Sequence, residues 1–196
     1  MSARLWYLRR GVAWLPVLAC CAGAAAIALL VVHWLDVAGV LAPAVLACCA
    51  GAAAYVYDED ALAVVAVTPR GANWRRTARL AVTLLPLSAW AVVVAVRPGD
   101  VAFVRPGWWL LGGATLVLVA GSAALASRRL VSTPGAVLAP VVALAAVAPV
   151  TLSGMFSWGS LYPIGNFPQA VRTVWLGVAV GGAAVCAVAF RPGLRP

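Results

Sequence analysis

Six long apolar segments constrain the fold of this chain more than any other feature of its sequence. A helix needs about 20 residues to cross a hydrocarbon core of about 30 Å, and each segment comes close to that length. The segments lack the alternating polarity of barrel strands, and in lipid only helices and closed barrels satisfy every backbone polar group. The sequence therefore predicts an all-α integral membrane protein with six transmembrane helices. These spans are expected at residues 12–35, 37–56, 80–96, 108–126, 135–152 and 170–190.

The composition leaves little room for anything besides these spans. Apolar residues make up 65% of the chain and charged residues 10%, and the mean hydropathy is +1.02. A water-soluble domain needs a more polar surface than this composition can supply. We therefore expect residues 1–196 to form a single six-helix transmembrane domain, without a soluble domain of its own. Only Met1–Arg10 precedes the first span, so little helix is expected before it.

The distribution of arginine predicts the orientation of the chain in the membrane. All 14 basic residues are arginine, against five acidic residues. If the two ends and alternate loops are assigned to opposite sides, 11 arginines fall on one side, and only Arg97, Arg105 and Arg172 fall on the other. The positive-inside rule then predicts that the N-terminus and the C-terminus are both cytoplasmic. Because the arginines lie between apolar runs and not along a stripe, we expect membrane lipids as partners, and no nucleic acid.

The lack of lysine also bears on the source of the chain. Alanine, valine, glycine and arginine are abundant while lysine is absent, a usage typical of a GC-rich, actinobacterial-like genome. We therefore expect a multi-pass protein of a bacterial cell (plasma) membrane.

The spans carry almost none of the side chains that active transport or catalysis requires. His33, near an outer end, is the single histidine, and no carboxylate or lysine lies within the six spans. Carriers coupled to ions usually hold a buried ionisable group, so a stand-alone secondary transporter is disfavoured. The sequence also has no Walker-type phosphate loop, no metal-ligand spacing and no Ser-His-Asp set. We expect no catalytic, cofactor-binding or metal site and no enzyme activity, so any energised work must draw on another polypeptide.

The loop between the second and third spans has a charge pattern that the other loops lack. Three of the five acidic residues stand together at its start, and acids there favour the first turn of a helix. An apolar stripe at helical spacing follows, and a Thr-Pro pair then ends the segment, which is far too short to span the bilayer. The pattern predicts a short amphipathic cytoplasmic helix. Its residues are Asp58, Glu59, Asp60, Leu62, Val65, Ala66, Thr68 and Pro69.

This loop resembles a segment of a known family. An acidic start, an apolar turn, a Thr-Pro stop and then Arg75, Arg76 and Arg79 entering the next helix resemble the permease subunits of type-2 ABC exporters. The B-type haem-exporter permeases are similar more distantly. The resemblance covers the six-span topology and roughly residues 57–80, and the outer loop at 153–169 resembles the re-entrant or surface segment that such permeases carry before their last span.

The resemblance implies that the chain is the transmembrane permease subunit of an ATP-driven exporter. In that family the segment is the coupling helix, which docks on a separate cytoplasmic ATPase that binds the ATP. The permease works as a dimer, with a second copy of itself or with a paralogue. The residues that the resemblance implicates in ATPase docking are Asp58, Glu59, Asp60, Leu62, Val65, Thr68, Pro69 and Arg70.

Two alternatives stay open. The acids of this loop would also suit an ordinary ion-paired connection, in which they meet Arg75, Arg76 or Arg79. The chain would then fit a non-transporting membrane anchor or assembly subunit of a larger membrane complex, a role that needs no chemistry of its own.

Four of the five cysteines lie in two identical strings. The sequence Ala-Cys-Cys-Ala-Gly-Ala-Ala-Ala occurs at residues 19–26 and again at 47–54, at about equal depth in the first two spans. A thiolate site for a soft metal is conceivable there. However, adjacent cysteines point to different helix faces, and no histidine or acid assists them, so we expect Cys20, Cys21, Cys48 and Cys49 to serve packing.

The remaining cysteine and the histidine have simpler interpretations. Cys186 stands alone in the last span, where we expect it to pack as a small apolar residue. His33 lies beside Trp34 at the outer interface, where a polar ring stays solvated at little cost. Anchoring at the interface is therefore favoured over a gating or binding role.

Overall fold

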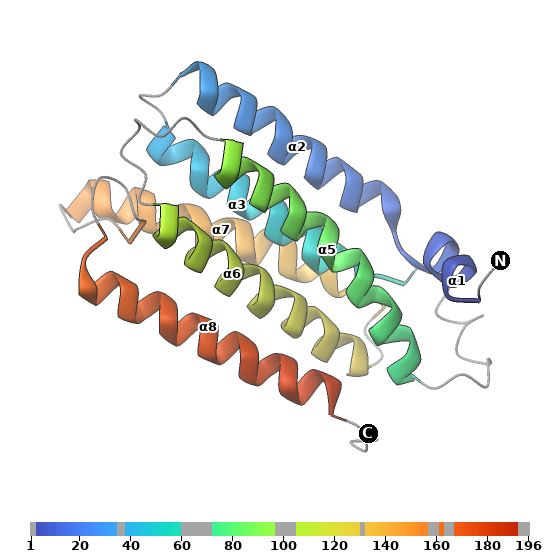
Figure 1. Ribbon diagram of the computed structural model, residues 1–196. Helices are drawn as coiled ribbons and strands as arrows, with labels where there is room; N and C mark the ends of the chain where they lie inside the picture. The colour runs from blue at the N-terminus through green and yellow to red at the C-terminus, as the bar shows by residue number, and fades with distance from the viewer. Residues whose placement is uncertain are drawn as a thin grey trace.

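The computed structural model describes residues 3–34, 38–59, 72–96, 105–129, 132–156, 161–162 and 167–191 (Figure 1). These residues form seven α-helices and one short 3-10 helix, with no strand among them, so the all-α prediction is confirmed for the described chain. In chain order the helices are α1 (Ala3–Gly11), α2 (Trp14–His33), α3 (Ala38–Tyr55), α5 (Ala72–Val96), α6 (Arg105–Ala126), the 3-10 helix η2 (Ser127–Arg129), α7 (Pro134–Phe156) and α8 (Gln169–Phe190).

Five of these helices, α2, α5, α6, α7 and α8, are long and apolar enough to cross a membrane. They contain between 20 and 25 residues each. The remaining predicted span, 37–56, coincides with α3, which has 18 residues and is apolar from Gly39 to Tyr55. At about 1.5 Å per residue, α3 is about 27 Å long, slightly less than the hydrocarbon core. The chain is thus a multi-pass membrane protein, while the count of six spans stays a prediction.

The helices begin and end at somewhat different residues than the apolar segments. α5 starts at Ala72, eight residues before the expected 80, and its first two turns carry Arg75, Arg76 and Arg79. The segment before the first span, where little helix was expected, forms α1, and a break at Val12 and Ala13 separates it from α2. Both differences arise where arginine-bearing residues form helix outside the apolar segments, which hydropathy alone does not register.

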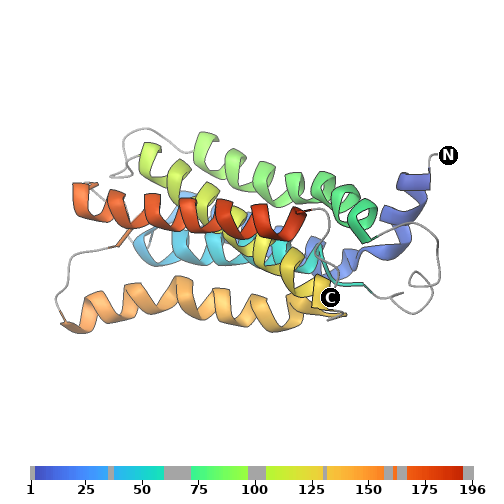
Figure 2. The ribbon, with the colours of Figure 1, turned by 90° about the horizontal axis from the view of Figure 1, so that it is seen from below.

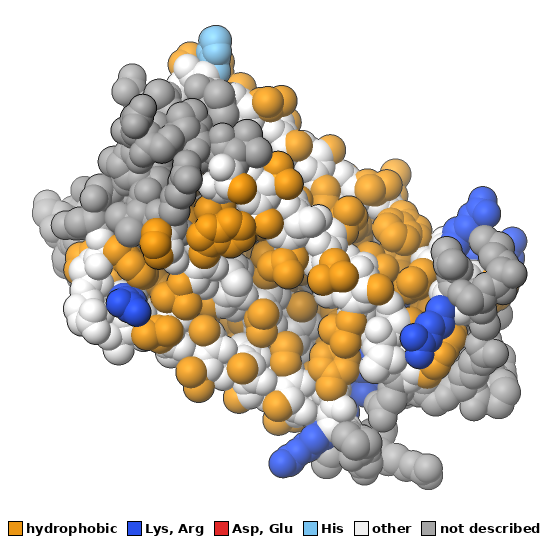
Figure 3. All heavy atoms as spheres, viewed as in Figure 1, with side chains coloured by type: hydrophobic (Ala, Val, Ile, Leu, Met, Phe, Trp, Pro, Cys, Tyr) orange, Lys and Arg blue, Asp and Glu red, His pale blue; other side chains and the backbone are white. Residues whose placement is uncertain are grey.

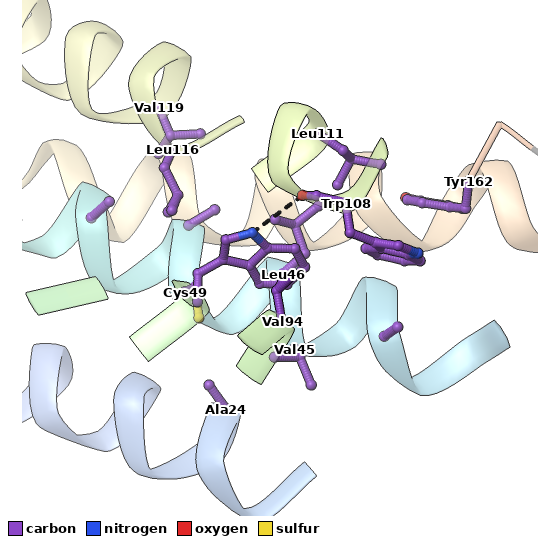
Figure 4. Close-up of a cluster of buried hydrophobic side chains, with 14 of the residues drawn as sticks. Ala24, Val45, Leu46, Cys49, Val94, Trp108, Leu111, Leu116, Val119 and Tyr162 are labelled. Atoms are coloured by element: carbon purple, nitrogen blue, oxygen red, sulfur yellow. Dashed lines mark hydrogen bonds between the residues drawn. The ribbon is translucent and has the colours of Figure 1, made fainter. Parts of the chain in front are cut away.

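α3 occupies the middle of the bundle. It packs against α2, α5, α6 and α7, while α8 packs on α6 (Figures 1 and 2). Side chains of α3, including Val45, Leu46 and Cys49, lie in the buried cluster drawn in Figure 4. A central helix surrounded by protein is shielded from lipid, so its shorter length carries little penalty.

Both chain termini lie at one end of the bundle, together with α1, the end of α3 and the start of α5 (Figure 1). We call this the arginine-rich end. Hydrophobic side chains cover most of the described face of the bundle in Figure 3, and most of the basic side chains visible there gather at this end. An apolar surface of this extent is unstable in water and suits hydrocarbon.

The two identical strings face each other across the α2–α3 contact. A Cβ built on Gly51 of α3 would lie 3.7 Å from Sγ of Cys20 on α2. A Cβ built on Gly23 of α2 would likewise lie 3.7 Å from Sγ of Cys48 on α3. Each string thus places a thiol beside the glycine of the other, in a reciprocal arrangement with room for one more methyl group at each glycine.

Glycines also bring α6 and α8 close together. A Cβ on Gly121 of α6 would lie 2.7 Å from Sγ of Cys186, and a Cβ on Gly182 of α8 would lie 3.0 Å from the backbone N of Leu118. The thiol of Cys186 contacts the carbonyl of Val117 at 3.4 Å. In lipid, where no hydrophobic effect drives helices together, such close backbone approach supplies the packing energy.

Aromatic side chains fill the end of the bundle opposite the termini. The indole of Trp90 donates a hydrogen bond to the carbonyl of Trp108 at 3.3 Å, drawn as the dashed line in Figure 4. Trp108 stacks on Tyr162 with ring centroids 5.9 Å apart, and the Tyr162 hydroxyl donates to the carbonyl of Ala146. Tyr162 belongs to the predicted re-entrant or surface loop at 153–169, and it is buried within the bundle.

Candidate functional site

Polar contacts converge at the arginine-rich end, where the chain leaves α3. A hydrogen-bonded turn follows the helix, in which the N–H groups of Val56, Tyr57 and Asp58 donate to carbonyls at the end of α3. The side chains of Val56 and Tyr57 are buried, and they anchor the turn in the bundle. Asp58 and Glu59, the last described residues before α5, are thereby directed toward neighbouring helices instead of away from the protein.

Arg79 of α5 is the most buried cation of the described chain, with 3% of its surface exposed. Its Nη1 donates to the carbonyl of Tyr57 at 2.6 Å and its Nη2 to the carbonyl of Gly11 at 2.7 Å. Gly11 ends α1, so the guanidinium satisfies a carbonyl that the helix itself leaves unpaired. The ring of Tyr7 lies under the same guanidinium, 5.5 Å from centroid to Cζ.

Glu59 joins this cation to a second one. Its carboxylate lies 3.4 Å from Nη2 of Arg79 and 3.2 Å from Nη1 of Arg75, and it accepts a 3.1 Å hydrogen bond from the hydroxyl of Tyr7. The backbone N–H of Glu59 donates to the carbonyl of Ser132, just before α7, at 2.9 Å. We call Tyr7, Glu59, Arg75 and Arg79 the Glu59 clamp.

Tyr7 acts in the clamp as a neutral donor. Burial is the main cause that raises the pKa of its phenol to about 12; the charge of Arg79 lowers this pKa, and the carboxylate of Glu59 raises it. The hydroxyl therefore keeps its proton at physiological pH and can donate it to Glu59. The ring of Tyr7 also packs against Trp74, with centroids 5.4 Å apart, which further ties α1 to α5.

Asp58 holds the start of α7. It is 4% exposed, and its Oδ1 accepts a hydrogen bond of 2.5 Å from the backbone N–H of Gly135 in the first turn of that helix. A carboxylate is favourable there because it complements the positive end of the helix dipole. A Cβ on Gly135 would lie 2.8 Å from Cα of Tyr55 and 2.9 Å from this carboxylate, so the contact requires glycine.

The structure therefore divides the predicted docking residues into two groups. Asp58 and Glu59 are engaged with α1, α5 and α7 inside the protein, and the ion pairs proposed as an alternative for this loop are present between Glu59 and the arginines Arg75 and Arg79. The other predicted residues lie outside the described residues. They are Asp60, Leu62, Val65, Thr68, Pro69 and Arg70.

Sequence reasoning did not find the other members of this site. Tyr7, Gly11, Ser132 and Gly135 contribute a phenol, two carbonyls and an N–H group from segments far away in the chain. Most of these contacts use backbone atoms, which leave no signal in the amino-acid pattern. A glycine immediately after a proline at the start of α7 is the one local hint that another group approaches closely there.

The cysteines and the histidine lie elsewhere and behave as small packing and surface residues. All five cysteines are free, and among the described residues no group of three or more His, Cys, Asp or Glu side chains is arranged to hold a metal ion. His33 is exposed and packs edge-on against Trp34, with ring centroids 5.2 Å apart. This geometry suits the interfacial position expected for the pair.

Comparison of the chain with protein-family models, with curated proteins and with solved structures finds no match. The candidate function therefore depends on the geometry of the bundle and of the Glu59 clamp.

Proposed function

We propose that this chain is the permease subunit of an ATP-driven exporter, moved by a separate cytoplasmic ABC ATPase. In this proposal the arginine-rich end faces the cytoplasm, and the permease pairs with a second copy or a paralogue. The spans hold no carboxylate or lysine for a coupling ion, so the energy for transport would come from the partner.

The observation that carries the proposal is the way the Glu59 clamp fixes both ends of segment 60–71. Glu59 stands immediately before the segment, and Arg75 and Arg79 stand just after it, so their ion pairs hold the two flanking parts of the chain together. The same clamp bonds to α1 through Tyr7 and to the residues before α7 through the backbone of Glu59. A force applied to this loop would therefore reach four helices at once, as a coupling segment requires.

The clamp also refines the docking site. Asp58 and Glu59 are held inside the protein, so docking would fall to the residues after the clamp, from Asp60 to Arg70. Asp58 and Glu59 would then have a positioning role: they hold the chain before the docking segment in place and do not themselves contact the ATPase.

Co-purification from the native host tests this proposal. We expect the tagged chain to recover an ABC ATPase, and we expect the double variant Asp60→Ala, Leu62→Arg to lose it while reaching the membrane at the same level. Thr133→Arg is a matched control, because it adds a positive charge to an exposed position at the same end but outside the segment. Recovery of the ATPase with the wild type, the control and the double variant alike would contradict docking on this loop.

The second candidate, a non-transporting anchor or assembly subunit, is favoured by the ion pairs themselves. Glu59 with Arg75 and Arg79 forms a rigid connection that a static bundle would also use. This role predicts that the wild-type chain recovers a stable membrane complex without any ATPase, and that the loop variant leaves this complex intact. The same co-purification thus separates the two candidates.

A further inference from the structure

The short helix α1 has two faces in different environments. Tyr7 and Gly11 are buried, and their hydroxyl and carbonyl groups bond to charged side chains of the Glu59 clamp. On a helix with 3.6 residues per turn, Trp6, Arg9 and Arg10 project from the opposite side, and all three side chains are exposed. The clamp therefore determines which side of α1 points away from the protein. We call Trp6, Arg9 and Arg10 the outer face of α1.

The outer face combines positive charge with an indole ring. The guanidinium of Arg10 lies over the ring of Trp6, 5.5 Å from Cζ to the ring centroid. Arg9 and, at the start of the helix, Arg4 are exposed as well, whereas the arginines of α5 at the same end of the bundle are partly or fully buried. The nine residues of α1 include three arginines and no acidic residue. This surface is therefore complementary to an anion.

α1 lies directly beside the first membrane-crossing helix. Only Val12 and Ala13 separate it from α2, whose apolar part begins at Trp14. The indole of Trp14 donates a hydrogen bond to the carbonyl of Leu8 at 2.9 Å, which fixes the corner between the two helices. In Figures 1 and 2 the axis of α1 is turned away from that of α2. A short basic helix that leaves a span at an angle is typical of a segment lying along the membrane surface.

The first turns of α2 provide an apolar surface next to α1. Leu15 and Leu18 are both exposed, and they lie within seven residues of the end of α1. Exposed leucines at the start of a span contact acyl chains. A lipid whose headgroup lies beside α1 can therefore place its acyl chains along α2.

We propose that the outer face of α1 binds the phosphate group of an anionic phospholipid and so anchors the arginine-rich end at the membrane surface. Guanidinium groups match phosphate oxygens in geometry and in charge, and a Trp ring is favoured at headgroup level. A soluble phosphate would meet the same arginines, but it has no acyl chain to lie along α2. This inference does not rest on the exporter proposal, because the residues of α1 lie outside the predicted docking segment.

Lipid titration of the purified full-length chain tests the proposal. The delipidated protein in detergent is titrated with phosphatidylglycerol, with phosphatidylcholine and with inorganic phosphate, and bound molecules are counted by native mass spectrometry. We expect phosphatidylglycerol to bind more tightly than phosphatidylcholine, because only the former carries a net negative charge. Inorganic phosphate should bind weakly, since it lacks acyl chains.

Two double variants with equal loss of charge locate the binding. Arg9→Gln with Arg10→Gln should weaken phosphatidylglycerol binding about tenfold, because each arginine near an anionic surface contributes to the attraction. Arg172→Gln with Arg191→Gln removes the same charge from exposed positions at the two ends of α8, and it should leave the affinity unchanged. All four side chains are exposed, so neither double variant disturbs the packing of the bundle.

A second measurement locates α1 relative to the membrane. In a variant whose five cysteines are replaced by alanine, a fluorophore is attached at the exposed position 4 through Arg4→Cys. In vesicles of phosphatidylcholine and phosphatidylglycerol, we expect a spin label on the lipid headgroup to quench this fluorophore more strongly than a spin label at the end of an acyl chain.

Weaker phosphatidylglycerol binding in the α1 double variant alone, together with headgroup quenching, supports the proposal. Equal weakening in both double variants overturns it, because total charge and not α1 would then govern binding. Unchanged binding in both variants, or no quenching by either spin label, also overturns it. Inorganic phosphate that binds as tightly as phosphatidylglycerol, with the same variant pattern, overturns the lipid as the partner of α1.

Discussion

Arg79 is the residue on which the arginine-rich end depends most. A buried guanidinium is unfavourable unless its charge and its donors are satisfied. Here two backbone carbonyls, the carboxylate of Glu59 and the face of Tyr7 surround it. These partners come from α1 and the turn after α3, so the cation that interrupts the apolar pattern of α5 also joins this helix to its neighbours.

We expect Glu59→Gln to lower the free energy of unfolding by about 1–3 kcal/mol, because it leaves the charge of Arg79 with neutral acceptors only. Glutamine keeps the shape of the side chain, so the change isolates the charge. Thermal unfolding in detergent measures the effect. Arg75→Gln is the matched control: this arginine side chain is 17% exposed, against 3% for Arg79, so its loss should cost less. If both variants unfold at the wild-type temperature, the clamp contributes nothing to stability.

At the scale of single residues, the sequence predicted the ion pairs of the site but not its other contacts. The acids after the second span and the arginines before the third are close in the chain and opposite in charge, so a pair such as Glu59 with Arg75 could be foreseen. Tyr7 and Gly135 could not, because their contacts depend on how α1 and α7 fold against α3 and α5. A residue pattern carries no information about such distant pairings.

At the scale of elements, hydropathy located the helices but not all of their ends. The apolar segments at 108–126 and 170–190 differ by three residues or fewer at each end from α6 and α8. The start of α5 at Ala72 was missed because its first turns are rich in arginine, and those turns are held by the clamp and not by lipid. Hydropathy identifies the part of a helix that lies in the membrane. Tertiary contacts determine the residue at which the helix ends.

The close approach of α6 and α8 can be tested by comparing substitutions at two adjacent glycines of α8. A Cβ on Gly182 would lie 3.0 Å from the backbone of Leu118, while nothing lies within 4 Å of a Cβ on Gly181. We expect Gly182→Ala to destabilise the protein by about 1–3 kcal/mol through overpacking. Gly181→Ala, one residue away on the same helix, should be neutral or stabilising by up to about 1 kcal/mol, since alanine favours helix.

Thermal unfolding of the two alanine variants in the same detergent makes this comparison. Because both substitutions add one methyl group to α8, differences in helix propensity cancel. Similar unfolding temperatures for the two variants would show that the close approach of α6 and α8 is not needed for stability.

At the scale of the whole molecule, the arrangement of the helices allows the orientation of the chain in the membrane to be tested. Ser132 precedes α7 at the arginine-rich end, and Gln169 begins α8 at the opposite end; both side chains are exposed. In a variant whose five cysteines are replaced by alanine, we expect Gln169→Cys to react with a membrane-impermeant thiol reagent on intact cells. Ser132→Cys should react only after permeabilisation, because the positive-inside rule places it in the cytoplasm.

The single-cysteine labelling also bears on the number of spans. α7 has 23 residues and lies between the two labelled ends, so labelling of both positions from the same side would contradict a membrane-crossing α7. The sequence predicted six spans from six apolar segments, and five helices meet the length required to cross. The remaining helix, α3, has 18 residues and packs against α2, α5, α6 and α7.

The reciprocal contact of the two identical strings in α2 and α3 has an evolutionary consequence. Cys20 faces Gly51 and Cys48 faces Gly23, each with its Sγ 3.7 Å from a Cβ built on the glycine, so the two contacts are locally alike. An added methyl group would make an ordinary van der Waals contact with the thiol at either position, so alanine fits at both and only a larger side chain would be opposed. Because the two environments match, the same limit on side-chain volume acts on two separate stretches of the gene.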